Sequence, residues 1–343
     1  MRRYVLALRR EIELLATTSW ASAVSLETVF FGGGTPSLLA AEDMGAILDG
    51  VRAHFDLERG AEITVECNPE SVSREKLAAY RAAGVNRVSL GVQSLDDSIL
   101  PVLGRLHDAG GARRAFGEAR AAGFDNVSVD LMYGLPKQDG GTWARSVEGV
   151  LAWEPEHLSA YGLTLDAGSV WAATGVEGLP AEGAVVEQYW ALARAAAARG
   201  FEHYEISNYA RPGLRSRHNQ IYWRAAEYLA CGPGACGFVG DVRYSNVKPV
   251  VRYCATLEDG ALPLDTSERL TERQRLGERL ILGLRLADGV PRAWLDERVA
   301  GDTALARRIA AWRERGILTD RGDNVVLTEA GFLVSDGLFV DLV

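Results

Sequence analysis

Cysteines are few in this chain of 343 residues: it has four, at Cys67, Cys231, Cys236 and Cys254. A disulfide framework is typical of small secreted chains with closely spaced cysteines, so this scattered set does not predict one. Cys231 and Cys236 are separated by four residues instead of the two of common zinc and redox motifs. We therefore expect both to be small buried residues.

Long hydrophobic runs and an excess of positive charge are also missing. No apolar stretch approaches the ~18–20 residues that a membrane helix needs, and residues 1–15 lack the uninterrupted apolar core of a signal peptide. The formal net charge is −9, from 37 Lys and Arg against 46 Asp and Glu, which argues against a broad nucleic-acid-binding surface. We expect a cytoplasmic protein that does not bind nucleic acid.

Hydrophobic residues make up 48% of the chain, which is ample for a large core. Short apolar runs alternate with amphipathic, alanine-rich segments over the first two-thirds, and this alternation predicts a parallel sheet with helical crossovers. Polar residues stand at the ends of most of these runs, as they do at the mouth of a barrel, so we favour a partial (β/α) barrel over an open sheet. The expected strands are residues 28–31, 62–67, 87–92, 126–132 and 158–163.

The pattern changes after about residue 260. Residues 270–285 and 304–316 have the periodicity of amphipathic helices, and residues 317–327 read as a hairpin. Helices followed by a hairpin predict a winged-helix-like unit, a fold that often binds DNA. Residues 265–343 hold twelve arginines, no lysine and fourteen acidic residues, so we favour a packing or lid role over DNA binding.

The sharpest local signal is the segment Phe31–Ser37 (FGGGTPS). Three consecutive glycines after a strand let backbone amides approach a ligand closely, and Thr35 can begin the next helix. The alternative is a tight strand-to-helix turn without a ligand. The segment lacks the lysine of a phosphate-binding loop and does not match the dinucleotide-binding fingerprint.

Further polar side chains stand at or just beyond the ends of expected strands. Taken singly, a carboxylate there usually caps the following loop, but together these side chains would line one mouth that suits a polar cofactor with an amine, a ribose or a carboxylate. Arg105 would pair with a ligand carboxylate, unless it is a solvated surface arginine. The strand-end residues are Glu66, Gln93, Asp130 and Thr164.

The segment His218–Trp223 (HNQIYW) combines one histidine with two aromatic rings. A lone histidine is more often structural than a ligand. The flat faces of Tyr222 and Trp223 would nevertheless suit a planar macrocycle with His218 as axial ligand.

Together these motifs, in this order, resemble the HemW family, the haem-chaperone branch of the radical SAM superfamily, also described as oxygen-independent coproporphyrinogen III oxidase-like. The resemblance runs from about Tyr4 to the end of the chain. The His-Asn-x-x-Tyr-Trp element is similar to the haem-chaperone branch and not to the true coproporphyrinogen dehydrogenase, HemN.

The resemblance implies an α/β fold, a partial (β/α)6 TIM-like radical SAM barrel with its first strand missing, and a C-terminal winged-helix-like unit. It implies residues 1–175 as barrel core, 176–260 as an extension with the HNxxYW motif, and 261–343 as the C-terminal domain. It also implies three cofactors: S-adenosylmethionine, a [4Fe–4S] cluster and haem, with His218 as candidate ligand of the haem iron. The residues implied at S-adenosylmethionine or a second ligand molecule are Gly33, Gly34, Thr35, Glu66, Gln93, Arg105, Asp130 and Thr164.

One departure from the family is serious. Its Cys-x-x-x-Cys-x-x-Cys triad, which holds the cluster, should precede Tyr4, and this chain starts at Met1 without it. We expect the triad upstream of Met1, left off by a start codon assigned too far downstream; the alternative is a truncated relative that has lost radical chemistry. A second departure is Cys236, where the family commonly has His.

The resemblance therefore implies a haem chaperone that binds haem and S-adenosylmethionine and delivers haem to acceptor proteins, with a peripheral membrane-associated protein as one candidate acceptor. Whether it is an enzyme stays open. The alternatives are oxygen-independent coproporphyrinogen III oxidation, which decarboxylates propionate side chains, a cluster-free haem carrier, and a scaffold that has lost its ligands.

Overall fold

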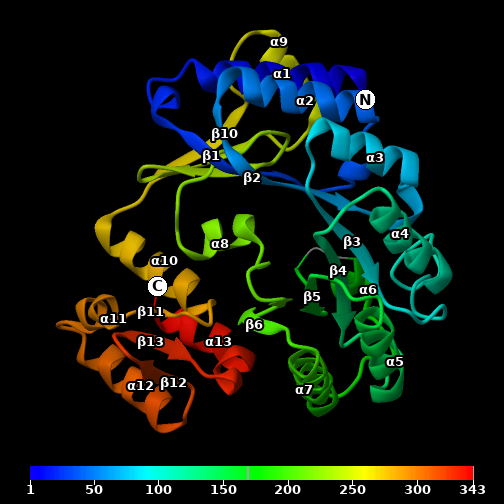
Figure 1. Ribbon diagram of the computed structural model, residues 1–343. Helices are drawn as coiled ribbons and strands as arrows, with labels where there is room; N and C mark the ends of the chain where they lie inside the picture. The colour runs from blue at the N-terminus through cyan, green and yellow to red at the C-terminus, as the bar shows by residue number, and fades with distance from the viewer. Residues whose placement is uncertain (168–169, 343) are drawn as a thin grey trace. The chain divides into compact units, whose positions relative to one another are not determined.

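The computed structural model describes residues 1–167 and 170–342 (Figure 1). They form two compact units. The barrel unit, as we call it, holds residues 29–44 and 62–216, and the second unit holds residues 1–28, 45–61 and the chain from Arg217 onward. The predicted domain division at residues 175 and 260 stays a prediction.

The largest sheet has seven strands in the order β1-β2-β3-β4-β5-β7-β6. Strands β2 to β5 pair in parallel, as the alternating pattern predicts, and β7 and β6 extend the sheet in antiparallel fashion. The strands are β1 Ser25–Phe31, β2 Asp56–Cys67, β3 Arg87–Gln93, β4 Val127–Tyr133, β5 His157–Gly162, β6 Glu202–Glu205 and β7 Asn208–Ala210.

Helices cover the outer face of the barrel strands β3, β4 and β5, as Figure 1 shows for α3, α4 and α5. Their ends follow local chemistry: Ser73 caps α3 by accepting a hydrogen bond from the backbone of Lys76, and Gly84 ends it with a positive φ of 113°. The helices of this region are α2 Ala41–His54, α3 Arg74–Ala83, α4 Ala109–Ala121, α5 Gly140–Leu151, α6 Val170–Thr174 and α7 Glu182–Ala198.

The opposite face of the barrel strands is polar. Side chains alternate along β3, so that Val88, Leu90 and Val92 share one face while Ser89 and Gln93 share the other. On β4, Asp130 accepts hydrogen bonds from Ser89, at 3.0 Å, and from Ser128. Ser89 and Ser128 therefore satisfy part of the hydrogen-bonding capacity of Asp130.

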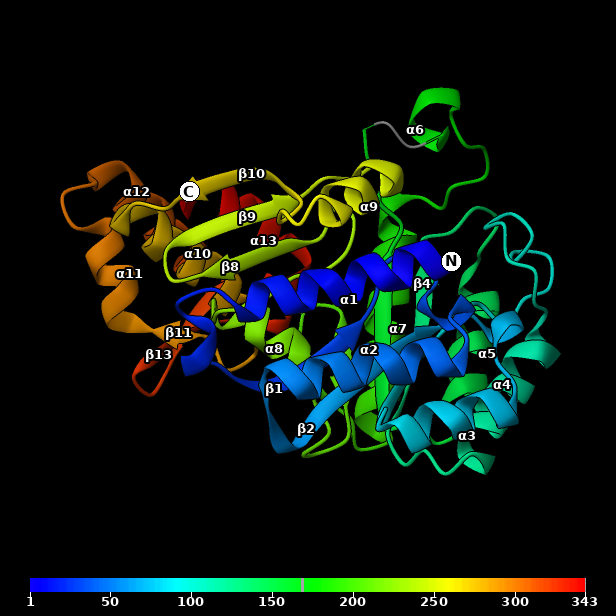
Figure 2. The same cartoon turned by 90° about the horizontal axis from the view of Figure 1, so that it is seen from above.

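The second unit begins with α1 (Arg2–Ala16). Figure 2 shows α1 beside α9 and the small sheet β10-β9-β8, and Tyr253 and Leu257 of α9 pack in a cluster with Ala7 of α1. Glu11 of α1 is buried and accepts a 2.8 Å hydrogen bond from the backbone of Gly232. The other elements here are α8 Arg217–Trp223, β8 Cys236–Val239, β9 Val242–Asn246, α9 Val250–Glu258 and β10 Leu264–Arg269.

The C-terminal part contains helices and a three-stranded antiparallel sheet in the order β11-β13-β12. Gly289 is required before β11, because its φ is +67° and a Cβ there would lie 2.2 Å from the carbonyl oxygen of Val325. The elements are α10 Glu272–Leu284, β11 Val290–Pro291, α11 Arg292–Val299, α12 Thr303–Glu314, β12 Leu318–Arg321, β13 Asn324–Leu327 and α13 Glu329–Leu342. Within the described ranges, no helix is long and apolar enough to cross a membrane.

Candidate functional site

The glycine-rich turn follows β1 directly and is exposed. Gly33 and Gly34 have φ values of +77° and +66°, which an L side chain rarely adopts, and a Cβ on either would meet nothing within 4 Å. The backbone of this turn therefore borders open space. The N–H of Gly33 donates a 3.1 Å hydrogen bond to Oε2 of Glu66, which ties the turn to β2.

Two carboxylates of the polar face, Glu66 and Asp130, have raised pKa values. Burial raises the pKa of Glu66 above its ordinary value, and the charge of Asp130 raises it further, while the hydrogen bond from Gly33 and the charge of Arg87 oppose this rise. Burial likewise raises the pKa of Asp130. Asp130 lies in the middle of β4 (Val127–Tyr133) and not at its end, where the sequence analysis places it.

Gln93 is held in a strained backbone conformation. Its φ is +66°, which is unusual for a residue other than glycine, and the pairing of β3 with β4 is irregular between Leu90 and Gln93. A Cβ on Gly91 would lie 3.1 Å from Nε2 of Gln93 and 3.5 Å from Oδ1 of Asn68. Both amides therefore lie close to this glycine.

Arg105 approaches the same region from the loop between β3 and α4. Its Nη1 donates a 3.0 Å hydrogen bond to Oδ1 of Asn68, two residues beyond Glu66 on the chain. Arg105 is thus held by a partner within the site and is not only a solvated surface side chain.

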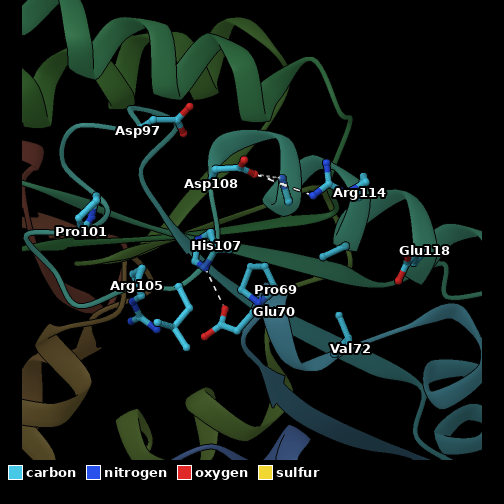
Figure 3. Close-up of a pocket in the computed structure, with 13 residues that line it drawn as sticks. Pro69, Glu70, Val72, Asp97, Pro101, Arg105, His107, Asp108, Arg114 and Glu118 are labelled. Atoms are coloured by element: carbon cyan, nitrogen blue, oxygen red, sulfur yellow. Dashed lines mark hydrogen bonds and ion pairs between the residues drawn. The ribbon is translucent and has the colours of Figure 1, made fainter.

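Arg105 also lines a pocket of about 490 Å³ (Figure 3). There the side chain of His107 points at Glu70, with Nδ1 2.9 Å from Oε2, and its Nε2 lies 3.2 Å from the carbonyl oxygen of Val92. Neither His107 nor Glu70 was among the residues predicted from the sequence. No local motif marks them, because they are 37 residues apart and meet only in the tertiary structure.

Thr164 lies two residues beyond β5 and is exposed. Its side chain makes no hydrogen bond within the part of the chain that the structure describes. The barrel unit therefore joins Gly33, Glu66 and Asp130 in one group, places Gln93 and Arg105 close to Asn68, and leaves Thr164 unconnected to either group.

His218 belongs to the second unit, where the HNQIYW segment forms the helix α8. Its Nδ1 lies 2.7 Å from the hydroxyl oxygen of Thr28, and its Nε2 lies 2.8 Å from the hydroxyl oxygen of Tyr222. The two rings meet edge to face, with centroids 5.0 Å apart. Both ring nitrogens are thus occupied, so a metal would reach His218 only after one hydroxyl moves away.

Two of the four cysteines differ from the sequence prediction in their burial. Cys231 and Cys236 are exposed, whereas we predicted that both would be buried; they lie in the turn before β8 and at its first residue. Cys67 and Cys254 are buried, and burial raises the pKa of the Cys67 thiol to about 12. Among the described residues, no three His, Cys, Asp or Glu side chains are placed to hold a metal ion.

The chain is similar in sequence to known protein families and to individual relatives. The family model of the radical SAM superfamily matches residues 4–148, and that of the HemN C-terminal domain matches residues 270–334. Heme chaperone HemW of Mycobacterium tuberculosis is 39% identical over 98% of this chain and 85% of its own length. Heme chaperone HemW of Bacillus subtilis is 33% identical over 96% of this chain and 88% of its own length.

Among solved structures, coproporphyrinogen III oxidase (HemN) from Escherichia coli superposes with a TM-score of 0.86, covering 99% of this chain and 82% of that chain. Its sequence identity of 21% supports a shared fold and nothing finer. The predicted α/β partial radical SAM barrel with a C-terminal winged-helix-like unit is confirmed.

Proposed function

Because the chain belongs to the HemW family of haem chaperones within the radical SAM superfamily, we propose that it binds haem and S-adenosylmethionine and passes haem to haem-requiring proteins. The acceptors, including a membrane-associated one, and a cytoplasmic location are part of this proposal.

The observation that carries the haem assignment is the setting of His218 on α8. The hydroxyl of Thr28 at Nδ1 orients the ring, as outer partners commonly do for metal-binding histidines, and leaves Nε2 as the nitrogen for iron. The hydroxyl oxygen of Tyr222 lies 2.8 Å from that nitrogen, so haem binding requires the hydroxyl to turn away.

S-adenosylmethionine fits the chemistry of the barrel unit. Its sulfonium and ammonium groups are cations. Burial and, to a lesser extent, the charge of Asp130 raise the pKa of Glu66, and a cation near these carboxylates would stabilise their ionised forms. The open backbone at Gly33 and Gly34 would take the methionine end, next to Thr35. The residues that we propose to line the rest of the ligand are Gln93, Arg105, Asp130 and Thr164.

The [4Fe–4S] cluster of this superfamily supplies one-electron chemistry when it is bound. The described residues do not fit it, since none of them forms a set of metal ligands. We assign the residues named above to binding and orienting S-adenosylmethionine and haem. Coproporphyrinogen III oxidation remains the alternative function, and it would require turnover of a porphyrinogen.

The test is a haem titration followed by the Soret band. We expect the wild-type protein to shift the band, His218→Ala to abolish the shift, and His54→Ala, which removes an exposed histidine of α2, to leave it intact. An unchanged spectrum for His218→Ala would remove His218 as ligand. No shift with the wild-type protein would refute haem binding itself.

A further inference from the structure

A second cavity, of about 240 Å³, lies beside the helix that carries His218. Its lining comes from α8, from the strands β8 and β9, and from α10, all within the second unit. We call it the α8–α10 pocket. Tyr222 and Trp223 of α8 form part of its wall, and His218 is not among the residues that line it.

Part of the wall of the α8–α10 pocket is aromatic. Tyr222, Trp223, Tyr228 and Phe238 all line it, and the rings of Tyr222 and Tyr228 meet edge to face with centroids 4.6 Å apart. Leu282 adds an aliphatic side chain. Aromatic and aliphatic walls of this kind favour a flat, conjugated ligand through stacking and the burial of apolar surface.

One face of α10 supplies charge to the same pocket. Arg275, Arg279 and Leu282 are spaced four and three residues apart, which puts them on one side of the helix. The guanidinium carbon of Arg279 lies 5.6 Å from the centroid of the Trp294 ring. Within the described ranges, neither Arg275 nor Arg279 has a carboxylate partner.

Arg243 is the third arginine of the lining and differs from these two. It is ion-paired at 2.7 Å to Glu278, which also lines the pocket, and at 2.7 Å to Glu268. The lining therefore has two arginines without a counter-charge in a chain whose net charge is −9. A guanidinium in this position is suited to a ligand carboxylate, which it can bind with two parallel hydrogen bonds.

We propose that the α8–α10 pocket binds the propionate-bearing edge of a tetrapyrrole, with the aromatic wall stacked on the ring and Arg275 paired with a propionate carboxylate. This inference rests on the proposed haem binding and adds to it a site that recognises the organic ring independently of iron. At about 240 Å³ the pocket is smaller than the roughly 300–1,000 Å³ of sites that enclose a whole ligand. Most of the macrocycle would thus stay accessible to an acceptor protein.

The test uses protoporphyrin IX without iron, whose binding is followed by porphyrin fluorescence anisotropy and does not depend on an axial ligand. We expect the wild-type protein and His218→Ala to bind it alike. Arg275→Gln should bind at least about tenfold more weakly, because a charge-assisted hydrogen bond is lost. Leu282→Glu, which puts a negative charge into the wall, should abolish binding.

Arg273→Gln is the matched control, because Arg273 is exposed on α10 and lies two residues away, on the other side of the helix. It should bind as the wild type does, and thermal melts of all variants would show that they fold. If Leu282→Glu does not fold, Arg275→Gln against Arg273→Gln decides the question.

The outcomes separate the two proposals. Equal affinity of Arg275→Gln and wild type would overturn the pocket, as would wild-type protein that shifts the Soret band of haem but does not bind protoporphyrin IX; haem binding would stand in both cases. Wild-type protein that binds neither ligand would overturn the proposed function together with the pocket.

Discussion

Replacing Tyr222 by Phe removes a single oxygen atom, the one that occupies Nε2 of His218 at 2.8 Å. If haem must displace this hydroxyl, the hydrogen bond is a cost of haem binding that the Phe variant no longer has. We therefore expect Tyr222→Phe to bind haem more tightly than the wild type. The ring itself remains in the α8–α10 pocket, so stacking is kept.

The size of the effect follows from the hydrogen bond that is lost. A protein hydrogen bond contributes about 0.5–1.5 kcal/mol net, which corresponds to an increase in haem affinity of about 2- to 13-fold. The same free energy should disappear from the stability of the haem-free protein, because the bond exists only there. A Soret titration measures the first quantity, and urea denaturation of the haem-free protein measures the second.

Tyr4→Phe is the control for this comparison. Tyr4 of α1 packs near Tyr253 of α9 and does not line the α8–α10 pocket, so its Phe variant removes a tyrosine hydroxyl without touching His218 and should leave the haem affinity near the wild-type value. Weaker haem binding by Tyr222→Phe would refute the reasoning, because it would mean that the hydroxyl helps to hold haem instead of competing with it.

Three further predictions concern other parts of the chain. Glu66→Gln should weaken S-adenosylmethionine binding at least about tenfold in calorimetric titration, while Glu58→Gln, an exposed carboxylate of the same strand, should not; equal affinities would reject the assignment of Glu66. Burial raises the pKa of Glu11, so the folded protein holds the proton of this carboxyl group more tightly than the unfolded chain does. The protonated group therefore contributes stability to the fold at low pH, and this stability is lost as the pH rises through the raised pKa. In denaturation from about pH 4 to pH 8, wild type should therefore lose stability relative to Glu11→Gln as the pH rises, and a constant difference would contradict this. Gly289→Ala should destabilise the protein by about 1–3 kcal/mol, because its Cβ would strike the carbonyl oxygen of Val325; an unchanged urea midpoint would show that β11 shifts without cost.

The strands and helices of the barrel unit were largely predictable from local pattern. The apolar run at residues 87–92 corresponds to β3 (Arg87–Gln93), and that at residues 126–132 corresponds to β4 (Val127–Tyr133). Their alternation with amphipathic helices was enough to predict parallel pairing, because a helical crossover brings consecutive strands into the same direction.

The geometry of the candidate sites was less predictable. Asp130 was expected at a strand end and lies in mid-strand, since strand length depends on pairing with neighbours and not on the run of apolar residues alone. Cys231 and Cys236 were expected to be buried and are exposed. The irregular pairing that gives Gln93 its positive φ has no signature in the sequence.

The family and the order of the motifs follow from the amino-acid sequence alone, as do the types of side chain that each motif contains. The folded chain alone shows which of these groups meet: Glu66 with Gly33, Arg105 with Asn68, and His218 with Thr28. The residues of these pairs lie 33, 37 and 190 positions apart in the sequence, so no local motif links them.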